Sequence, residues 1–83
     1  MSKHQKALEK MRQNPKNVRY DELERLLLNL GFIIRRGTGS HVVFTLRGHP
    51  PLTVPKRKPF LSETYIKQVL IFLDGLGLSD DEH

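Results

Sequence analysis

The stretch DELERLLLNLGFIIRRGTGSHVVF, residues 21–44, changes its hydrophobic period once, from that of a helix to that of a strand. Its leucines recur at the i, i+3, i+4, i+7 spacing of one helical face: Leu23, Leu26, Leu27 and Leu30. Gly31 is a natural helix stop. The β-rich segments 32–36 and 41–47 follow, and the GTGS between them is typical of a hairpin turn. We therefore expect a helix over residues 20–30 that leads into a β-hairpin.

The N-terminal part has a helical pattern of its own. Residues 2–13 place three apolar side chains on one side, and Pro15 ends the segment because the residue before a proline avoids the helical region. Residues 16–19 are expected to form a linker. Asp21 and Glu22 then fall in the first turn of the 20–30 helix, where the helix dipole favours negative charge.

The C-terminal part predicts one more strand and one more helix. Residues 52–54 read as a short strand, closed by Pro55 and placed at an edge of the sheet. Ser62 is a good N-cap for a last helix, which Gly75 and Gly77 are expected to end. The apolar stripe of that helix consists of Ile66, Val69, Leu70 and Leu73.

Together these segments predict an α+β fold, in which a three-stranded antiparallel sheet packs on helices through one face. We expect a single domain over residues 1–83, with an N-terminal helical extension (1–17), a core (18–74) and a C-terminal tail (75–83). Alternation along 41–47 assigns the two faces of the sheet. Val42, Phe44 and Leu46 should meet the helices, while His41, Val43, Thr45 and Arg47 should stay on the open face.

The charge distribution points to a polyanionic partner. The 83 residues carry a formal charge of +5, and residues 31–61 contain no Asp or Glu. A basic block without anions suits the phosphates of a nucleic acid, since each neutralised phosphate releases counterions. Cysteine is absent and the N-terminus lacks the apolar core of a signal peptide, so we expect a cytoplasmic protein with no membrane span.

Few chemistries suit these residues. The four histidines form no close helical pair, so no metal ligand set and no cofactor is expected. Ser40 precedes His41 directly, and because strand neighbours point to opposite faces, a serine–histidine pair is poorly supported. An RNA strand, however, supplies its own nucleophile in the 2′-hydroxyl. A histidine can move the proton, and nearby Lys or Arg can stabilise the charge on phosphate, so His41 is a candidate for either proton transfer.

The arrangement of these segments resembles the HicA toxin family over residues 18–73. The most specific elements are a helix that ends in Gly31-Phe32, then a short strand, then Gly39-Ser40-His41 entering the next strand. The TVP of residues 53–55 and the helix YIKQVLIFL over 65–73 are further matches. The resemblance implies a double-stranded-RNA-binding-domain-like fold. It also implies a metal-independent mRNA interferase of a type II toxin–antitoxin module, whose catalytic histidine follows Gly-Ser.

That role falls on His41, and the implied partners are mRNA and a HicB-type antitoxin that covers the active face. Two departures from the family pattern stand out. Many relatives carry a histidine shortly after Val-Pro, whereas this chain has Lys56-Arg57-Lys58 after Pro55. Lysine or arginine supplies charge there without convenient proton exchange. The second departure is the additional helix over residues 2–13.

The candidate site therefore has one catalytic residue, His41, and a set of residues expected to contact RNA. Gly37 and Gly39 suit turn geometry and close backbone approach. Arg35 and Arg36 alternate, so at most one shares a face with His41. The expected RNA contacts are Arg36, Gly39, Ser40, Arg47, Lys56, Arg57 and Lys58.

Three functions stay open at this point. The leading hypothesis is the endoribonuclease. A non-catalytic RNA-binding module of the same fold would leave RNA intact, and its affinity would survive replacement of His41 by alanine. A protein-interaction domain would use its basic face for an acidic partner, which would compete with RNA or replace it. A small-molecule enzyme is disfavoured, because nothing in so short a chain indicates a deep pocket.

Overall fold

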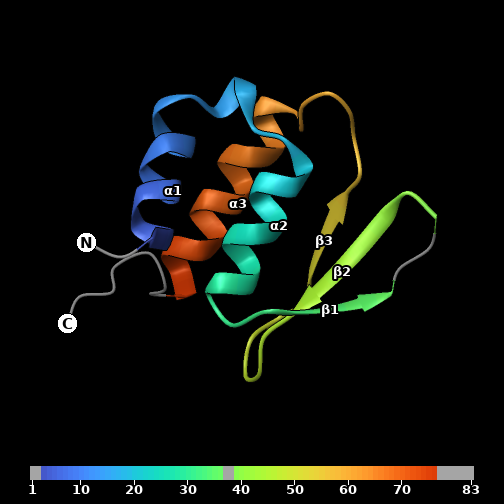
Figure 1. Cartoon of the computed structure of the whole chain (residues 1–83). Helices are drawn as coiled ribbons and strands as arrows, with labels where there is room; N and C mark the ends of the chain where they lie inside the picture. Colours follow the sequence, from blue (N-terminus) through green and yellow to red (C-terminus); the bar gives the residue numbers. More distant parts are fainter. Residues whose placement is uncertain (1–2, 37–38, 77–83) are drawn as a thin grey trace.

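The computed structural model has the expected α+β architecture and describes residues 3–36 and 39–76 (Figure 1). Its arrangement, a three-stranded antiparallel sheet packed on helices through one face, is that of the double-stranded-RNA-binding domain, which confirms the predicted fold class. The described elements are α1 (Lys3–Gln13), the 3₁₀ helix η1 (Pro15–Asn17), α2 (Tyr20–Asn29), β1 (Ile33–Arg36), β2 (His41–Thr45), β3 (Leu52–Pro55) and α3 (Glu63–Leu76).

The strands form an antiparallel sheet in the order β1-β2-β3. Phe44 in the central strand pairs with Ile34 on one side and Leu52 on the other, and its side chain is fully buried. Val42, two residues earlier, packs against the same core. His41 is exposed, as expected for a residue of opposite parity. The predicted assignment of the two faces of β2 is confirmed.

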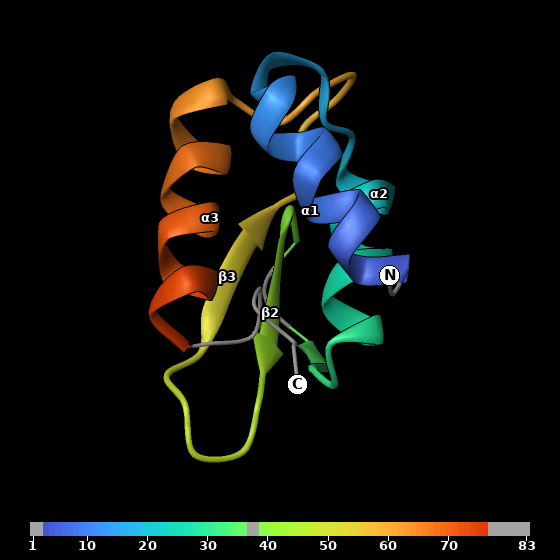
Figure 2. The same cartoon turned by 90° about the vertical axis from the view of Figure 1, so that its left-hand side faces the viewer.

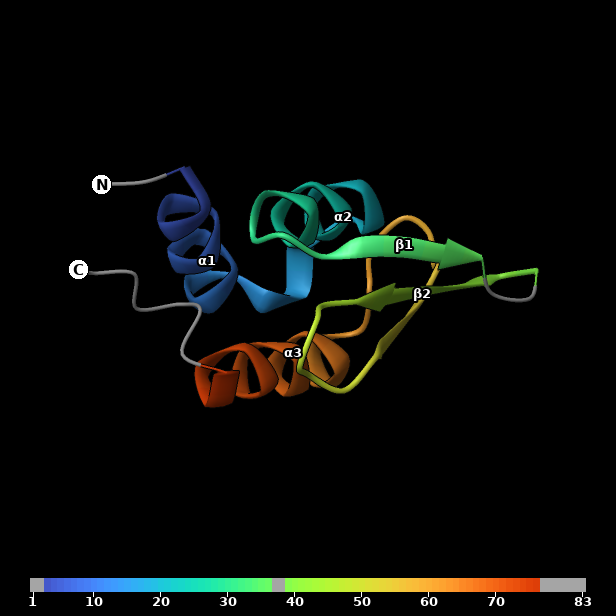
Figure 3. The same ribbon diagram turned by 90° about the horizontal axis from the view of Figure 1, so that it is seen from below.

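The helices form two layers on one side of the sheet (Figures 1 and 3). α2 and α3 lie against the sheet, and α1 lies over both of them on the side away from the strands (Figure 2). Leu8 and Met11 of α1 are only 1% and 4% exposed and belong to the same hydrophobic cluster as the leucines of α2. Apolar burial by α1 therefore stabilises the α2–α3 layer directly.

The segment 16–19, expected to be a plain linker, contributes to the core. Val18 is 2% exposed, and its carbonyl accepts a hydrogen bond of 2.8 Å from the amide of Leu61. Leu61 is itself buried, just before α3. The interpretation as a linker was wrong. Val18 is a single apolar residue between polar neighbours, so no periodicity indicates its burial, which depends on contact with the distant Leu61.

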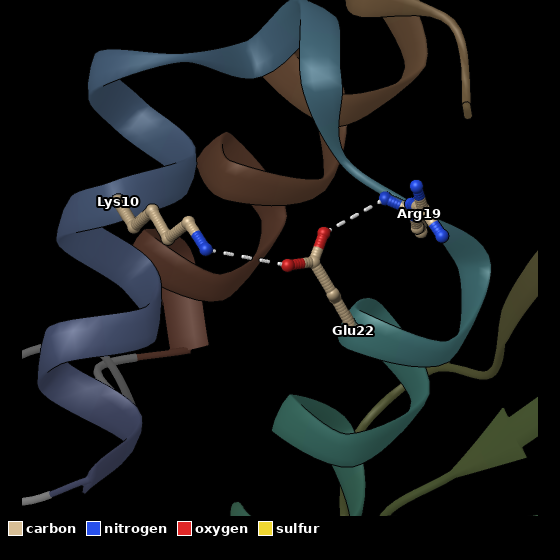
Figure 4. Close-up of polar contacts among 3 residues, drawn as sticks. All are labelled: Lys10, Arg19 and Glu22. Carbon is tan, nitrogen blue, oxygen red and sulfur yellow. Dashed lines mark hydrogen bonds and ion pairs between the residues drawn. The ribbon is translucent and has the colours of Figure 1, made fainter. Parts of the chain in front are cut away.

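The start of α2 is fixed by Glu22 (Figure 4). One carboxylate oxygen accepts a hydrogen bond of 3.0 Å from the backbone amide of Arg19, the residue before the helix. The other lies 3.4 Å from Lys10 Nζ of α1. An acidic residue in the first turn satisfies a backbone donor that the helix leaves free and suits the helix dipole. Glu22 thereby caps α2 and links its first turn to α1.

The ends of α2 and α3 differ from each other. Gly31 follows α2 with φ +105°, a conformation that favours glycine, so the expected stop is confirmed. Ser62 caps α3 as expected, because its Oγ accepts a hydrogen bond of 3.1 Å from the amide of Tyr65. Gly75, by contrast, lies inside α3.

The prediction that Gly75 ends the helix was wrong. A glycine costs a helix only about 1 kcal/mol relative to alanine. Leu73 is buried before Gly75, and Leu76 packs against the core after it, which favours continuation of the helix to Leu76. The second expected stop, Gly77, and the rest of the predicted tail lie outside the described residues.

Candidate nucleic-acid site at the His41 end of the sheet

His41 opens β2 and lies at the end of the sheet where the chain returns from the first hairpin. Its backbone pairs with Pro55, the last residue of β3, and its side chain is exposed. Ser40 Oγ lies 3.4 Å from His41 Nδ1. The expectation that these two side chains point to opposite faces was wrong, because Ser40 belongs to the turn before β2, where strand alternation does not hold.

A hollow of about 480 Å³ lies beside His41. One wall comes from the first turns of α2, and the other comes from the core side of β1 and β2. The residues at the strand ends complete it. Its lining includes Tyr20, Glu24, Ile34, Gly39, His41 and Lys56. The packing of α2 on the sheet thus places a tyrosine and a carboxylate beside the histidine, although they lie some twenty residues apart in sequence.

Lys56 is anchored on both its backbone and its side chain. Its amide donates a hydrogen bond of 2.7 Å to the carbonyl of Ser40, which continues the pairing of β2 with β3. Its Nζ lies 5.6 Å from the centroid of the Tyr20 ring, within the range of a cation–π interaction. An ammonium group therefore lies on the border of the hollow that His41 lines.

Tyr20 and Glu24 interact with each other one helical turn apart. Burial raises the pKa of the Tyr20 hydroxyl, and the Glu24 carboxylate raises it further, through its negative charge and as the acceptor of a hydrogen bond from that hydroxyl. Both side chains are half-buried. The hydroxyl therefore stays protonated at neutral pH, and the carboxylate keeps the remaining lone pairs of its two oxygens as acceptors.

The expected basic run continues past Lys56 around the start of α2. Arg57 and Lys58 line a second hollow, of about 670 Å³, together with Arg19, Tyr20 and the acidic residue Asp21. Tyr20 therefore borders both hollows. Arg19 also lies over the ring of Phe60, 5.7 Å from its centroid. Four cations surround the beginning of α2, and Arg19 was not among the residues expected from the sequence.

Two other predicted RNA contacts occupy different positions. Arg47 follows β2 at the far end, so the length of the strand separates it from His41. Arg36 pairs with Val42, the residue that faces the core, whereas Arg35 pairs with Val43. Arg35 is therefore the arginine of β1 in register with the open face. Gly39 has φ +44° and lies in the turn next to the hollow, while Gly37 lies outside the described residues.

Sequence reasoning missed Tyr20 and Glu24. They occur in the same helical segment as the leucine stripe, and no local pattern distinguishes them from ordinary surface residues. Only the docking of α2 on the sheet shows that they line the hollow beside His41. No group of three or more His, Cys, Asp or Glu side chains in residues 3–36 and 39–76 could hold a metal ion.

The fold and the site define a small α+β protein with an exposed histidine and a cluster of cations at one end of its sheet. Comparison with family models matches the HicA toxin of bacterial toxin–antitoxin systems over residues 20–73, more than half of the chain. The chain therefore belongs to the HicA toxin family, which makes it the toxin of a toxin–antitoxin system with a cognate antitoxin. Comparisons with curated proteins and with solved structures gave no match.

Two features lie beyond these conclusions. α1 precedes the matched region, so the family match does not account for it. Among the helices of the described ranges, none is long and apolar enough to cross a membrane.

Proposed function

We propose that this toxin is a metal-independent endoribonuclease that cleaves mRNA, with His41 as the general acid/base. The observation that carries the proposal is the position of His41. It is exposed at the end of the sheet, beside a hollow bordered by the ammonium group of Lys56 and the glycine turn. Proton transfer and charge stabilisation are the two requirements of RNA transesterification, and these groups supply both.

In this mechanism the neutral imidazole of His41 accepts the proton of a ribose 2′-hydroxyl. O2′ then attacks the adjacent phosphorus, and the P–O5′ bond breaks. The departing O5′ takes a proton from the imidazolium or from water. Lys56 offsets the negative charge that develops on the phosphate oxygens. The products are a 2′,3′-cyclic phosphate and a 5′-hydroxyl.

The experiment is incubation of the purified toxin with end-labelled mRNA in EDTA, with analysis of the fragment ends. We expect cleavage, cyclic phosphate ends, and no cleavage of an otherwise identical strand that carries 2′-deoxyribose. Cleavage of the deoxy strand, or cleavage that stops in EDTA, would contradict the mechanism.

A second candidate is a non-catalytic RNA-binding module. Lys56-Arg57-Lys58 stands where many relatives have a further histidine, and these residues bind phosphate without convenient proton exchange. In that case the same incubation leaves the RNA intact, and the toxin binds it with a steep salt dependence.

The cognate antitoxin is proposed to be of the HicB type and to cover the open face of the sheet, His41 included. Apolar side chains suited to a protein partner lie on that face. Ile33 is 63% exposed, and it pairs with Thr45, which alternates with the core residue Phe44. Val43 is half-buried on the same face. Toxin and antitoxin are proposed to act in the cytoplasm.

The remaining assignments are proposals as well. Arg36, Gly39, Ser40, Arg47, Lys56, Arg57 and Lys58 are proposed RNA contacts, and Arg35 joins them because of its register. The division into an extension (1–17), a core (18–74) and a tail (75–83) also remains a proposal. The extension is not separate from the core in packing, because its Leu8 and Met11 belong to the buried hydrophobic cluster.

A further inference from the structure

The hollow beside His41 contains two groups that the proposed cleavage chemistry does not use. Tyr20 contributes an aromatic ring, and Glu24 contributes a half-buried carboxylate. Neither group is needed to hold a phosphate, and a carboxylate repels one. Their presence in a hollow that is also lined by His41 and Lys56 points to a ligand group other than phosphate.

The ring of Tyr20 suits a nucleobase. Proteins that bind single-stranded RNA stack unpaired bases on aromatic side chains, and stacking tolerates every base because each has a π-face. Lys56 Nζ lies over this ring, 5.6 Å from its centroid, so a base that stacks there displaces the ammonium, which can then neutralise the phosphate attached to the base. The hollow has about 480 Å³ of space on this side of His41.

The carboxylate of Glu24 distinguishes among the bases. An ionised carboxylate only accepts hydrogen bonds, and its two oxygens suit two parallel donors. Guanine presents two adjacent donors on its Watson–Crick edge, the N1–H and the N2 amino group. Adenine and cytosine place a ring-nitrogen lone pair next to their amino group, and uracil has one N–H between two carbonyls. Guanine is thus the base whose edge matches Glu24.

Glu24 lies one helical turn from Tyr20, and both line the same hollow. The two oxygens of an ionised carboxylate offer about four lone-pair sites, so acceptors are present for a ligand beside the tyrosine. Burial strengthens any hydrogen bond formed there, because partial exclusion of water lowers the local dielectric constant.

We propose that Tyr20 and Glu24 form a nucleobase subsite that selects guanine next to the phosphate handled by His41. The subsite adds a base preference to the proposed ribonuclease function, and its role in cleavage rests on that proposed function. Tyr20 stacks the base, and Glu24 accepts hydrogen bonds from its N1–H and N2 amino group. Guanine-containing single-stranded RNA is therefore the preferred substrate.

The test uses 2′-O-methyl oligouridines with one central purine, so that binding is measured on strands that cannot be cleaved. We expect the guanine strand to bind about tenfold more tightly than the adenine strand, the discrimination typical of a good bidentate contact. Inosine, which lacks the N2 amino group, should bind with intermediate affinity. Glu24→Gln should abolish the preference, so that the guanine and adenine strands bind with equal affinity.

Glu9→Gln, an exposed carboxylate on α1, is the matched control and should keep the guanine preference. Tyr20→Phe should retain base stacking, whereas Tyr20→Ala should lower the affinity for every strand by about tenfold. Circular dichroism confirms that each variant is folded. Equal binding of guanine and adenine by the wild type, or an undiminished preference in Glu24→Gln, would overturn the subsite.

A cleavage assay on the matching ribose strands keeps the two proposals apart. If the wild type cleaves but binds guanine and adenine equally, the ribonuclease function stands and the subsite fails. If it prefers guanine but cleaves nothing, the subsite stands as part of an RNA-binding module and the catalytic proposal fails.

Discussion

The helical layers and the His41 end of the sheet are built from different kinds of residue. Every residue buried in the described core is hydrophobic, from Leu8 in α1 to Leu73 in α3. The residues around His41 are exposed or half-buried, and several are charged. The buried core residues supply most of the favourable free energy of folding, whereas the exposed His41, Lys56, Arg57 and Lys58 contribute little. Stability and RNA chemistry should therefore respond to different substitutions.

The largest expected effect on stability is in the core below the sheet. Phe44→Ala should lower the free energy of unfolding by about 3–5 kcal/mol, because it leaves a cavity where a fully buried ring packed. Urea denaturation measures this. Thr45→Ala, the next residue and on the other face, should cost less than about 1 kcal/mol. An equal loss of unfolding free energy in the two variants would contradict the assignment of one face of β2 to the core and the other to solvent.

At the sheet end the largest effect should be on RNA binding. Replacing Lys56, Arg57 and Lys58 by glutamine should flatten the plot of log affinity against log salt by about two units, as for three lost phosphate contacts on a single strand. The unfolding free energy should hardly change. The control replaces three exposed lysines of the helical layers, Lys6, Lys16 and Lys67. A control with the same loss of slope would mean that net charge alone governs binding.

A smaller effect is expected where the two regions join. Tyr65 of α3 donates a hydrogen bond of 2.6 Å to the carbonyl of Thr53 in β3. Tyr65→Phe should cost about 1 kcal/mol of unfolding free energy. RNA binding should be unaffected if this contact serves the fold alone.

The Tyr65 hydroxyl should also make the free energy of unfolding depend on pH. Burial raises the pKa of Tyr65 in the folded state above its ordinary value. The unfolded chain therefore loses this proton first, so wild-type stability should fall as the pH rises above about 10. Tyr65→Phe should show a shallower decline over the same range. Identical slopes in urea titrations would contradict the assignment.

The smallest effect is expected at the helix surface. Arg12 of α1 and Asp74 of α3 form an ion pair of 2.6 Å, with about half of the Asp74 side chain exposed. Exposed pairs of this kind contribute little, so Arg12→Ala should cost less than about 1 kcal/mol and lose even that in high salt. A larger, salt-independent cost would show that α1 is held by more than its apolar face.

The sequence predicted the fold well where the signal was periodic. The leucines of α2, the alternation of β2 and the stripe of α3 each combine many residues into one pattern. Prediction from the sequence failed at single residues whose burial or conformation depends on contacts with other parts of the fold. Val18 is buried because it meets Leu61, and Gly75 remains helical because Leu73 and Leu76 are packed.

The candidate site was predictable only in part for the same reason. Gly39-Ser40-His41 is a local motif, and the basic run after Pro55 is local as well. Tyr20, Glu24 and Arg19 reach the site through the docking of α2 on the sheet, which no short stretch of sequence encodes. Alternation along β1 predicts only that Arg35 and Arg36 point to opposite faces of the sheet. The pairing of β1 with β2 is needed to show that Arg35 is the one on the open face.

The most direct test of the central claim measures two quantities on His41→Ala, the rate of mRNA cleavage in EDTA and the free energy of unfolding. Loss of a general acid/base lowers a rate by about 10²–10⁴-fold, while an exposed strand-end residue contributes within about 0.5 kcal/mol to stability. We predict that cleavage falls to background and that stability is unchanged. Cleavage at the wild-type rate by a folded His41→Ala protein would contradict the account.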